Sequence, residues 1–147
     1  MEEYRERSCL GSIRPVAGFS RPLILKCLAK NKSAFRFEVY ENPFEYHTIN
    51  NEIISVPVGF KTDFASVPWF FRRVIPATGR YNEATVIHDY LCYLSNKLQY
   101  NRRKADRIFY EAMADLEVNK LKSLVIYFGV RAYTEILLLY KTVKDFF

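Results

Sequence analysis

The spacing of the hydrophobic residues changes near residue 80, and this change constrains the fold of the chain. Before it, short runs rich in β-branched and aromatic residues are separated by Asn, Lys and Pro, and apolar and polar residues alternate at 35–39. After it, apolar residues recur every three or four positions, as in amphipathic helices. The pattern predicts an α+β fold in which a small antiparallel sheet from the N-terminal half packs against about three C-terminal helices.

The first half is expected to contain several short strands. The predicted strands cover residues 23–28, 35–40, 44–48 and 53–58. The last two can form a hairpin across Asn50 and Asn51. Pro57 and Gly59 end this sheet, since Pro cannot donate to a strand ladder and Gly permits a turn. We expect residues 62–68 to form a tight loop.

The second half is expected to contain three helices. Asn82 is the predicted N-cap of the first, Asn101 caps the second, and the third extends from about residue 119 to about residue 144. The residues predicted to face the core are Ala84, Ile87, His88, Leu91 and Leu94 in the first helix, Ala105, Ile108, Phe109, Ala112, Met113 and Leu116 in the second, and Leu121, Leu124, Val125, Phe128, Ala132, Ile136, Leu139 and Val143 in the third.

The third helix is apolar on more than one side, as a membrane-spanning helix would be. Lys122, Arg131, Glu135 and Lys141 interrupt it, so no uncharged stretch of about 18 residues remains. We therefore predict no transmembrane segment. The second apolar side is covered either by the small sheet or by a second copy or partner protein, and the sequence leaves both open.

Size and cysteine content point to one domain in a reducing compartment. A chain of 147 residues, half of them hydrophobic, can bury a core of its own, and residues 1–147 are expected to form a single domain. Cys9, Cys27 and Cys92 are odd in number and show no C-x-x-C spacing. This argues against a disulfide framework and against a thiolate zinc site. Cys92 is interpreted as a small core residue.

The net charge of +6 is concentrated in the second half of the chain. A positive half can steer a chain towards nucleic acid, anionic lipid or an acidic partner. However, the basic residues mostly occur singly along the helices, apart from Arg72-Arg73 and residues 102–104. A solvated helix face is therefore favoured over a nucleic-acid surface.

Three short polar clusters lie on hydrophobic backgrounds, at residues 61–68, at His88-Asp89 and at residues 102–106. Ionisable groups among apolar neighbours must pair with one another or bind a ligand. The clusters therefore predict one buried polar network or one site. In either case Asp63, His88 and Asp106 should meet in one pocket.

Each cluster also has a local, structural explanation. A histidine on the apolar face of a helix is usually a satisfied core residue, and Asp89 diverges from His88 by about 100° around the helix. Asp63 and Ser66 suit a side-chain-stabilised turn or helix cap. Arg102 and Asp106, four residues apart, can form a surface ion pair.

The chemistry that these residues could perform is only partly constrained. The chain lacks the phosphate-binding, dinucleotide-binding, zinc-protease and nucleophile-elbow motifs. A match to the His-Asp phosphohydrolases would need more histidines than His47 and His88. Two arrangements stay open: a divalent-metal site and a hydrolytic site. The metal candidates are Asp63, His88, Asp89 and Asp106, and the hydrolytic residues are Ser66, His88 and either Asp63 or Asp89.

The order of the motifs resembles an uncharacterised family from tailed bacteriophages and prophages, catalogued as domain of unknown function 1353. That family shows V-P-x-G-F-x-T-D-F-A-S-x-P, A-x-x-x-H-D-x-L and R-x-x-A-D-x-x-F runs and a late V-R pair. Here these are residues 56–68, 84–91 and 102–109, and Val130-Arg131. The match covers about residues 35–135 and leaves residues 1–30 as a peripheral N-terminal segment. The defining polar positions are Thr62, Asp63, Ser66, His88, Asp89, Arg102 and Asp106.

The resemblance implies a phage or prophage origin and a compact α+β domain, and it supplies no reaction. The favoured hypothesis is a virion-associated or accessory protein whose partners are other phage structural proteins or a second copy held through the C-terminal helix. We expect synthesis in the host cytoplasm, with incorporation into the virion left open.

The alternative is a small hydrolase with a His/Asp site. In it His88 is the general base or a metal ligand, and Asp63 and Asp89 orient it or hold a divalent ion. Thr62, Arg102 and Asp106 are binding residues, with Arg102 holding an anionic group.

Overall fold

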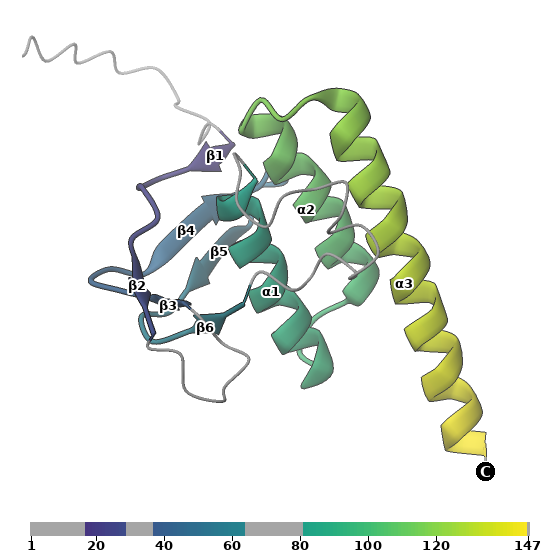
Figure 1. The fold of residues 1–147 in the computed structure, drawn as a ribbon. Helices are drawn as coiled ribbons and strands as arrows, with labels where there is room; N and C mark the ends of the chain where they lie inside the picture. The colour runs from purple at the N-terminus through teal and green to yellow at the C-terminus, as the bar shows by residue number, and fades with distance from the viewer. Residues whose placement is uncertain (1–16, 29–36, 64–80, 147) are drawn as a thin grey trace, which may run out of the picture.

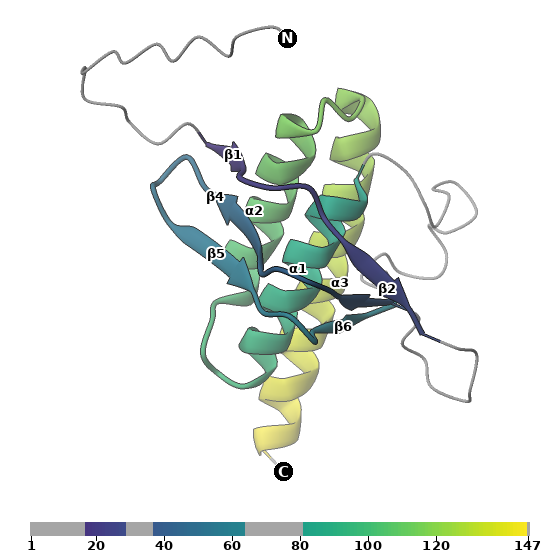
Figure 2. The same ribbon diagram turned by 90° about the vertical axis from the view of Figure 1, so that its left-hand side faces the viewer.

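The computed structural model describes residues 17–28, 37–63 and 81–146. Within them, six short strands are followed by three helices, α1 (Asn82–Asn96), α2 (Arg102–Asp115) and α3 (Lys120–Phe146). Helices α1 and α2 lie between the strands and α3 (Figure 1). Turned by 90°, the strands face the viewer and the helices stand behind them (Figure 2). The predicted α+β fold is confirmed.

The strands form two antiparallel sheets instead of the single sheet expected. One sheet has the order β1-β4-β5, from β1 (Gly18–Phe19), β4 (Phe44–His47) and β5 (Ile53–Val56). The other has the order β2-β3-β6, from β2 (Leu25–Cys27), β3 (Phe37–Val39) and β6 (Lys61–Thr62). Strands β1 and β2, from the segment expected at the periphery, lie at sheet edges.

The predicted hairpin is strands β4 and β5. Phe44 pairs with Val56 and Tyr46 with Ile54, and all four side chains are buried. This alternation places one face of the hairpin in the core that α1 and α2 complete. Asn51 adopts a φ of 61° in the turn, a conformation that asparagine tolerates better than most residues.

The loop expected over residues 62–68 begins as a strand. Thr62 is paired with Phe37 in β6, so the prediction that it belongs to a loop is wrong. Its hydroxyl is buried and bonded to α1, which fixes a segment too short to show a strand pattern in the sequence. Residues 64–68, including Ser66, lie outside the described residues.

Of the two predicted N-caps, one is confirmed and one is wrong. Asn101 caps α2 as predicted, because its Oδ1 accepts a hydrogen bond from the Lys104 amide at 3.1 Å. Asn82 is not the N-cap of α1. The carbonyl of Tyr81 already accepts the amide of Thr85 at 2.9 Å, so the helix begins one residue earlier than the sequence suggested.

Helix α3 presents the opposite face to the core from the one predicted. The buried side chains are Ser123, Ile126, Val130 and Thr134. The predicted inward stripe is largely exposed, at Leu121, Val125, Phe128, Ala132, Ile136, Leu139 and Val143. The spacing of hydrophobic residues cannot show which of two apolar faces of a helix is buried. In the folded protein Ile126 and Val130 of the other face join the core, and Arg131 and Glu135 make ion pairs to α2.

Helix α3 also has the length and composition of a membrane-crossing helix. Residues Lys120–Asp145 contain an 18-residue window of mean hydropathy 1.3 with no more than 2 charged residues, and 28% of that window is buried. It is the one such helix among the described residues. Core helices of soluble proteins meet the same criteria. The predicted lack of a transmembrane segment stays a prediction.

Candidate functional site

Helix α1 directs its two neighbouring ionisable residues to different partners. His88 contacts Asp106 of α2, whereas Asp89 accepts a hydrogen bond from Thr62 of β6. Consecutive residues of a helix diverge by about 100°. His88 and Asp89, although adjacent in sequence, therefore belong to two polar groups on different sides of α1.

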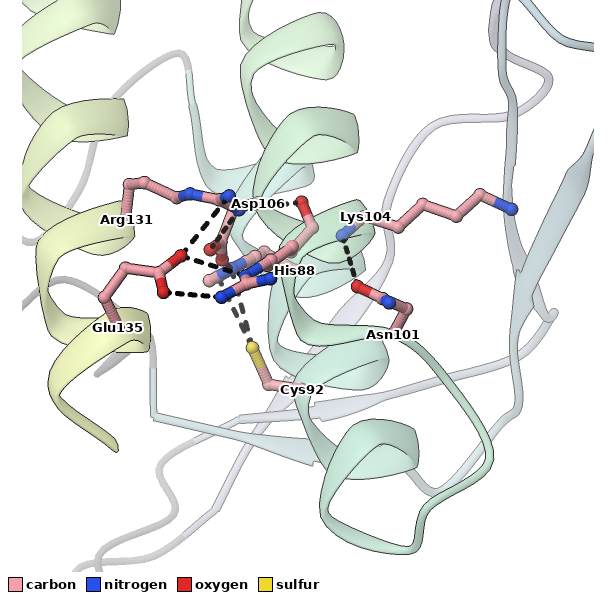
Figure 3. A network of polar contacts seen from close by, with 8 residues as sticks. His88, Cys92, Asn101, Lys104, Asp106, Arg131 and Glu135 are labelled. Carbon is pink, nitrogen blue, oxygen red and sulfur yellow. Dashed lines mark hydrogen bonds and ion pairs between the residues drawn. The ribbon is translucent and has the colours of Figure 1, made fainter. Parts of the chain in front are cut away.

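The first group is centred on a buried histidine (Figure 3). His88 Nε2 lies 2.9 Å from Asp106 Oδ1, and the two side chains are 1% and 0% exposed. The ring of His88 also stacks on Phe109, with centroids 4.6 Å apart and planes inclined by 19°. A carboxylate and an aromatic face thus hold the imidazole in one orientation.

Cys92 lies one helical turn after His88 and is the third member of this group, in contact with the imidazole ring. Its Sγ is 3.5 Å from Nε2 and 3.8 Å from Nδ1 of the imidazole. The cysteine is free and only 8% exposed, which confirms its interpretation as a core residue.

The group continues from Asp106 to α3. Arg131 Nη1 lies 3.8 Å from Asp106 Oδ2, and Arg131 Nη2 lies 3.3 Å from Glu135 Oε1. Arg103 binds Glu135 through two contacts of 3.0 and 2.8 Å. Alternating charges therefore link α1, α2 and α3 in one chain of contacts that becomes more exposed towards Glu135 (Figure 3).

These contacts determine the protonation of His88. Burial alone lowers its pKa, but Cys92 and Asp106 together raise the pKa to about 10. The contact with Asp106 favours the protonated imidazole, whose Nε2–H donates to the carboxylate. A sealed histidine held in this way is suited to joining helices.

The second group surrounds Asp89, which is partly buried. Burial and, to a smaller extent, the nearby charge of Asp63 raise the pKa of Asp89, whereas the Thr62 hydrogen bond, His88 and Arg102 lower it, and the net result is a pKa of about 7. The Nε atom of Arg102 is buried without a hydrogen-bond partner.

The expected meeting of Asp63, His88 and Asp106 is realised only in part. His88 contacts Asp106, whereas Asp63 lies within electrostatic range of Asp89. The predicted Arg102–Asp106 surface pair is wrong, because Asp106 is fully buried and its charged partners are His88 and Arg131.

The metal candidates are divided between the two groups. Within residues 17–28, 37–63 and 81–146, no three His, Cys, Asp or Glu side chains are placed to hold a metal ion. His88 and Asp106 Oδ1 instead contact each other. A divalent ion at Asp63 and Asp89 stays a prediction.

Sequence reasoning missed a third polar group, between the hairpin and α2. The hydroxyl of Tyr46 lies 2.6 Å from Asp115 Oδ2 and 3.1 Å from Glu111 Oε1. Burial and these carboxylates raise the pKa of Tyr46. The amide of Ile49 donates to the same Glu111 oxygen at 2.7 Å. The four-residue spacing of Glu111 and Asp115 is the available sequence signal, and it does not reveal Tyr46.

Comparison with known proteins places these groups in a family. A family profile described as "Protein of unknown function (DUF1353)" matches residues 37–130, more than half of the chain. The chain belongs to this family. The matched DUF1353 region contains Thr62, His88, Asp89 and Asp106, and it ends within α3 immediately before Arg131.

A curated relative of this DUF1353 chain is named "Uncharacterized protein y4jT", from Sinorhizobium fredii (strain NBRC 101917 / NGR234). The two are 35% identical over 80 residues, which cover 53% of this chain and 23% of the relative. The DUF1353 chain thus matches less than a quarter of that protein. No solved structure matches the chain.

Proposed function

We propose that this DUF1353 protein is an accessory or virion-associated protein of a tailed phage or prophage, acting through protein–protein contacts of α3. The phage assignment rests on the motif resemblance. The observation that carries the contact role is the exposed apolar stripe of α3, defined as Leu121, Val125, Phe128, Ala132, Ile136, Leu139 and Val143.

The polar residues of the first group favour a structural role. A catalytic residue must reach its substrate, yet His88 and Asp106 are 1% and 0% exposed. Their charges are matched within the chain, by each other and by Arg131. Burial of an ion pair is unfavourable unless the geometry of the pair is good. Here the pair links α1 to α2, the helix against which α3 packs.

The apolar stripe favours a contact role. Leu121 and Leu139 are 72% and 67% exposed, and Phe128 and Ile136 are each 63% exposed. Single exposed apolar residues are ordinary, but a continuous row of them marks an interaction surface. Removal of this surface from water favours association, and the loss of translational and rotational freedom opposes it.

Virion composition tests the proposal with a matched pair of variants. Leu139→Glu places a charge in the stripe, whereas Leu98→Glu makes the same change at a 93% exposed leucine outside α3. The wild type and Leu98→Glu should be retained in purified particles or bound to a defined tail or head protein, and Leu139→Glu should be lost. Equal retention of both variants, or failure of the wild type to bind any phage structural protein, contradicts the proposal.

A small hydrolase is the second candidate, and the Asp89 group is the observation that favours it. Asp89 is partly accessible, has a pKa of about 7 and lies near Asp63 and Arg102. A carboxyl that titrates near neutrality is suited to general acid–base catalysis. In this candidate Asp89, and not His88, transfers the proton, and Arg102 holds an anionic group.

Mg²⁺ and Mn²⁺ titrations test the metal-dependent form of this candidate. Calorimetry on the wild type should show binding that Asp89→Asn abolishes without lowering the thermal midpoint. Asp145→Asn, at an exposed position on α3, is the control. Equal heats from wild type and Asp89→Asn would count against a metal at this group.

A further inference from the structure

We propose that the α3 stripe is covered by α3 of a second copy of this chain, in an antiparallel pair whose two-fold axis passes beside Ala132. This inference rests on the proposed function, because it requires α3 to be the contact surface. It adds the identity and the orientation of the occupant.

The spacing of the stripe is symmetric about its centre. Successive members are separated by four, three, four, four, three and four residues, so the row reads the same in both directions from Ala132. A two-fold axis pairs each position with its mate reciprocally, and this spacing lets every member of the row meet another member of the row. Antiparallel pairing places Leu121 against Val143, Val125 against Leu139, Phe128 against Ile136, and Ala132 against Ala132 of the second copy.

The side chains suit a close approach of two straight helices. The smallest member, Ala132, lies at the centre, where the helices can come nearest. The spacing repeats after eleven residues, about 3.67 residues per turn, so the row stays on one face with little supercoiling. From Leu121 to Val143 the contact would be roughly 33 Å long at about 1.5 Å per residue.

The exposed area is of the size that a pair of helices needs. Side chains of this size and exposure present on the order of 600 Å² of apolar surface, at the upper end of what single chains usually expose. A standard interface buries about 800 Å² per partner. Tyr133 and Tyr140, also exposed beside the stripe, supply further area.

The charges beside the stripe are compatible with the antiparallel orientation. Arg131 and Glu135 lie on the same flank of α3. Antiparallel pairing brings equal flanks together and places Arg131 near both Arg131 and Glu135 of the second copy. Parallel pairing would instead oppose this flank to the one that carries Lys122 and no carboxylate. The stripe itself contains no charged residue.

Salt dependence separates a second copy from an anionic occupant. Each chain carries a net charge of +6, so two copies repel one another at long range. Salt screens this repulsion and strengthens apolar association. Pairing of the full-length chain should therefore be at least as strong in 0.5 M as in about 0.1 M NaCl, whereas binding to an anionic lipid surface or an acidic protein would weaken.

Sedimentation velocity on the full-length protein tests the pairing. The wild type and Leu98→Glu should sediment as dimers at micromolar concentration, and Leu139→Glu and Ala132→Glu should sediment as monomers with unchanged circular dichroism at low concentration. A wild type that remains monomeric at high salt, or an Ala132→Glu chain that remains dimeric, overturns the proposal.

Disulfide cross-linking tests the orientation, in a chain whose Cys9 and Cys27 are replaced by serine. Ala132→Cys should cross-link to itself on oxidation. Leu121→Cys should cross-link only when mixed with Val143→Cys. Self-cross-linking of Leu121→Cys would indicate parallel pairing and overturn the orientation.

Failure of this inference can be told from failure of the proposed function. A monomeric wild type whose retention in virions is abolished by Leu139→Glu overturns the second copy and keeps the contact role of α3. A dimer that binds no phage structural protein supports the second copy and contradicts the phage role.

Discussion

Helices α1 and α3 place their unusual residues in opposite directions. Helix α1 turns a histidine inward, where Asp106 and Cys92 contact it. Helix α3 turns a row of apolar side chains outward, where no other described residue buries them. Polar groups can be buried when their partners come from the same chain, so His88 of α1 needs no partner from a second molecule. The apolar row of α3 has no such partner among the described residues, and for this reason we propose that it is a contact surface.

The two helices should therefore respond differently to substitution. Changes at the His88 group should reduce the stability of the single chain, because charges would be left buried without a partner. Changes at the α3 stripe should leave that stability intact and affect association. The following tests are ordered from the largest expected effect to the smallest.

The first test removes the partner of the buried histidine. Asp106→Asn should lower the free energy of unfolding by about 3–5 kcal/mol, because protonated His88 and Arg131 lose their buried counter-charge. Urea denaturation measures the change, with Asp145→Asn as the exposed control. A loss no larger than that of the control would show that the contact is not an ion pair.

The second test varies the pH. The pKa of His88 is raised from 6.5 to about 10 in the folded protein, so the folded state binds this proton more tightly. The resulting stability is fully present below about pH 6.5 and is lost as the pH rises through about 10. The free energy of unfolding across this range should fall more steeply in the wild type than in His88→Gln, by a difference on the order of 5 kcal/mol at about 1.4 kcal/mol per pKa unit. Parallel curves would contradict the assignment.

The third test concerns the other side of α1. The pKa of Asp89 is raised from 3.8 to about 7, so its charged form is disfavoured by folding, and the native state loses stability as the pH rises across that interval. Asp89→Asn keeps an acceptor for Thr62 and should stabilise the protein by about 1 kcal/mol at pH 8. The gain should vanish as the pH falls below about 3, where the wild-type carboxyl is largely protonated in both states. A gain that persists there would indicate another cause.

The fourth test is expected to leave stability unchanged. Phe128→Ala, at a 63% exposed position, should alter the free energy of unfolding by less than about 0.5 kcal/mol under monomeric conditions. Phe109→Ala, at a position buried beside His88, should reduce it by about 3–5 kcal/mol. Chemical denaturation of the two variants gives the comparison, and a large loss from Phe128→Ala would mean that α3 packs through its stripe.

The sequence predicted those parts of the fold that depend on local periodicity. The α+β class, the β4–β5 hairpin and the buried faces of α1 and α2 follow from patterns of period two and about 3.6. The orientation of α3 could not be predicted, because both of its faces are apolar. It depends on long-range contacts, the packing of Ile126 and Val130 in the core and the ion pairs of Arg131 and Glu135 with α2.

The candidate site was predictable in its residue types and less so in its contacts. The inward position of His88 and its divergence from Asp89 follow from helix geometry. The bond to Asp106 depends on how α1 and α2 pack, and i,i+4 spacing suggested Arg102 instead. The Tyr46 contact with Asp115 joins residues 69 positions apart, and no local pattern encodes it.

The last turns of α3 extend beyond the rest of the molecule (Figure 1). After Glu135, almost all side chains in this stretch are exposed or partly exposed. An isolated helix of about eleven residues is only marginally formed in water, because the initial turn is unfavourable to nucleate. The backbone amides of this segment should therefore exchange with solvent rapidly in the free chain and slowly once a partner docks. The helix–coil equilibrium of this segment would thus report whether the proposed contact surface of α3 is occupied. Binding of the proposed partner and ordering of the C-terminal segment would then be coupled.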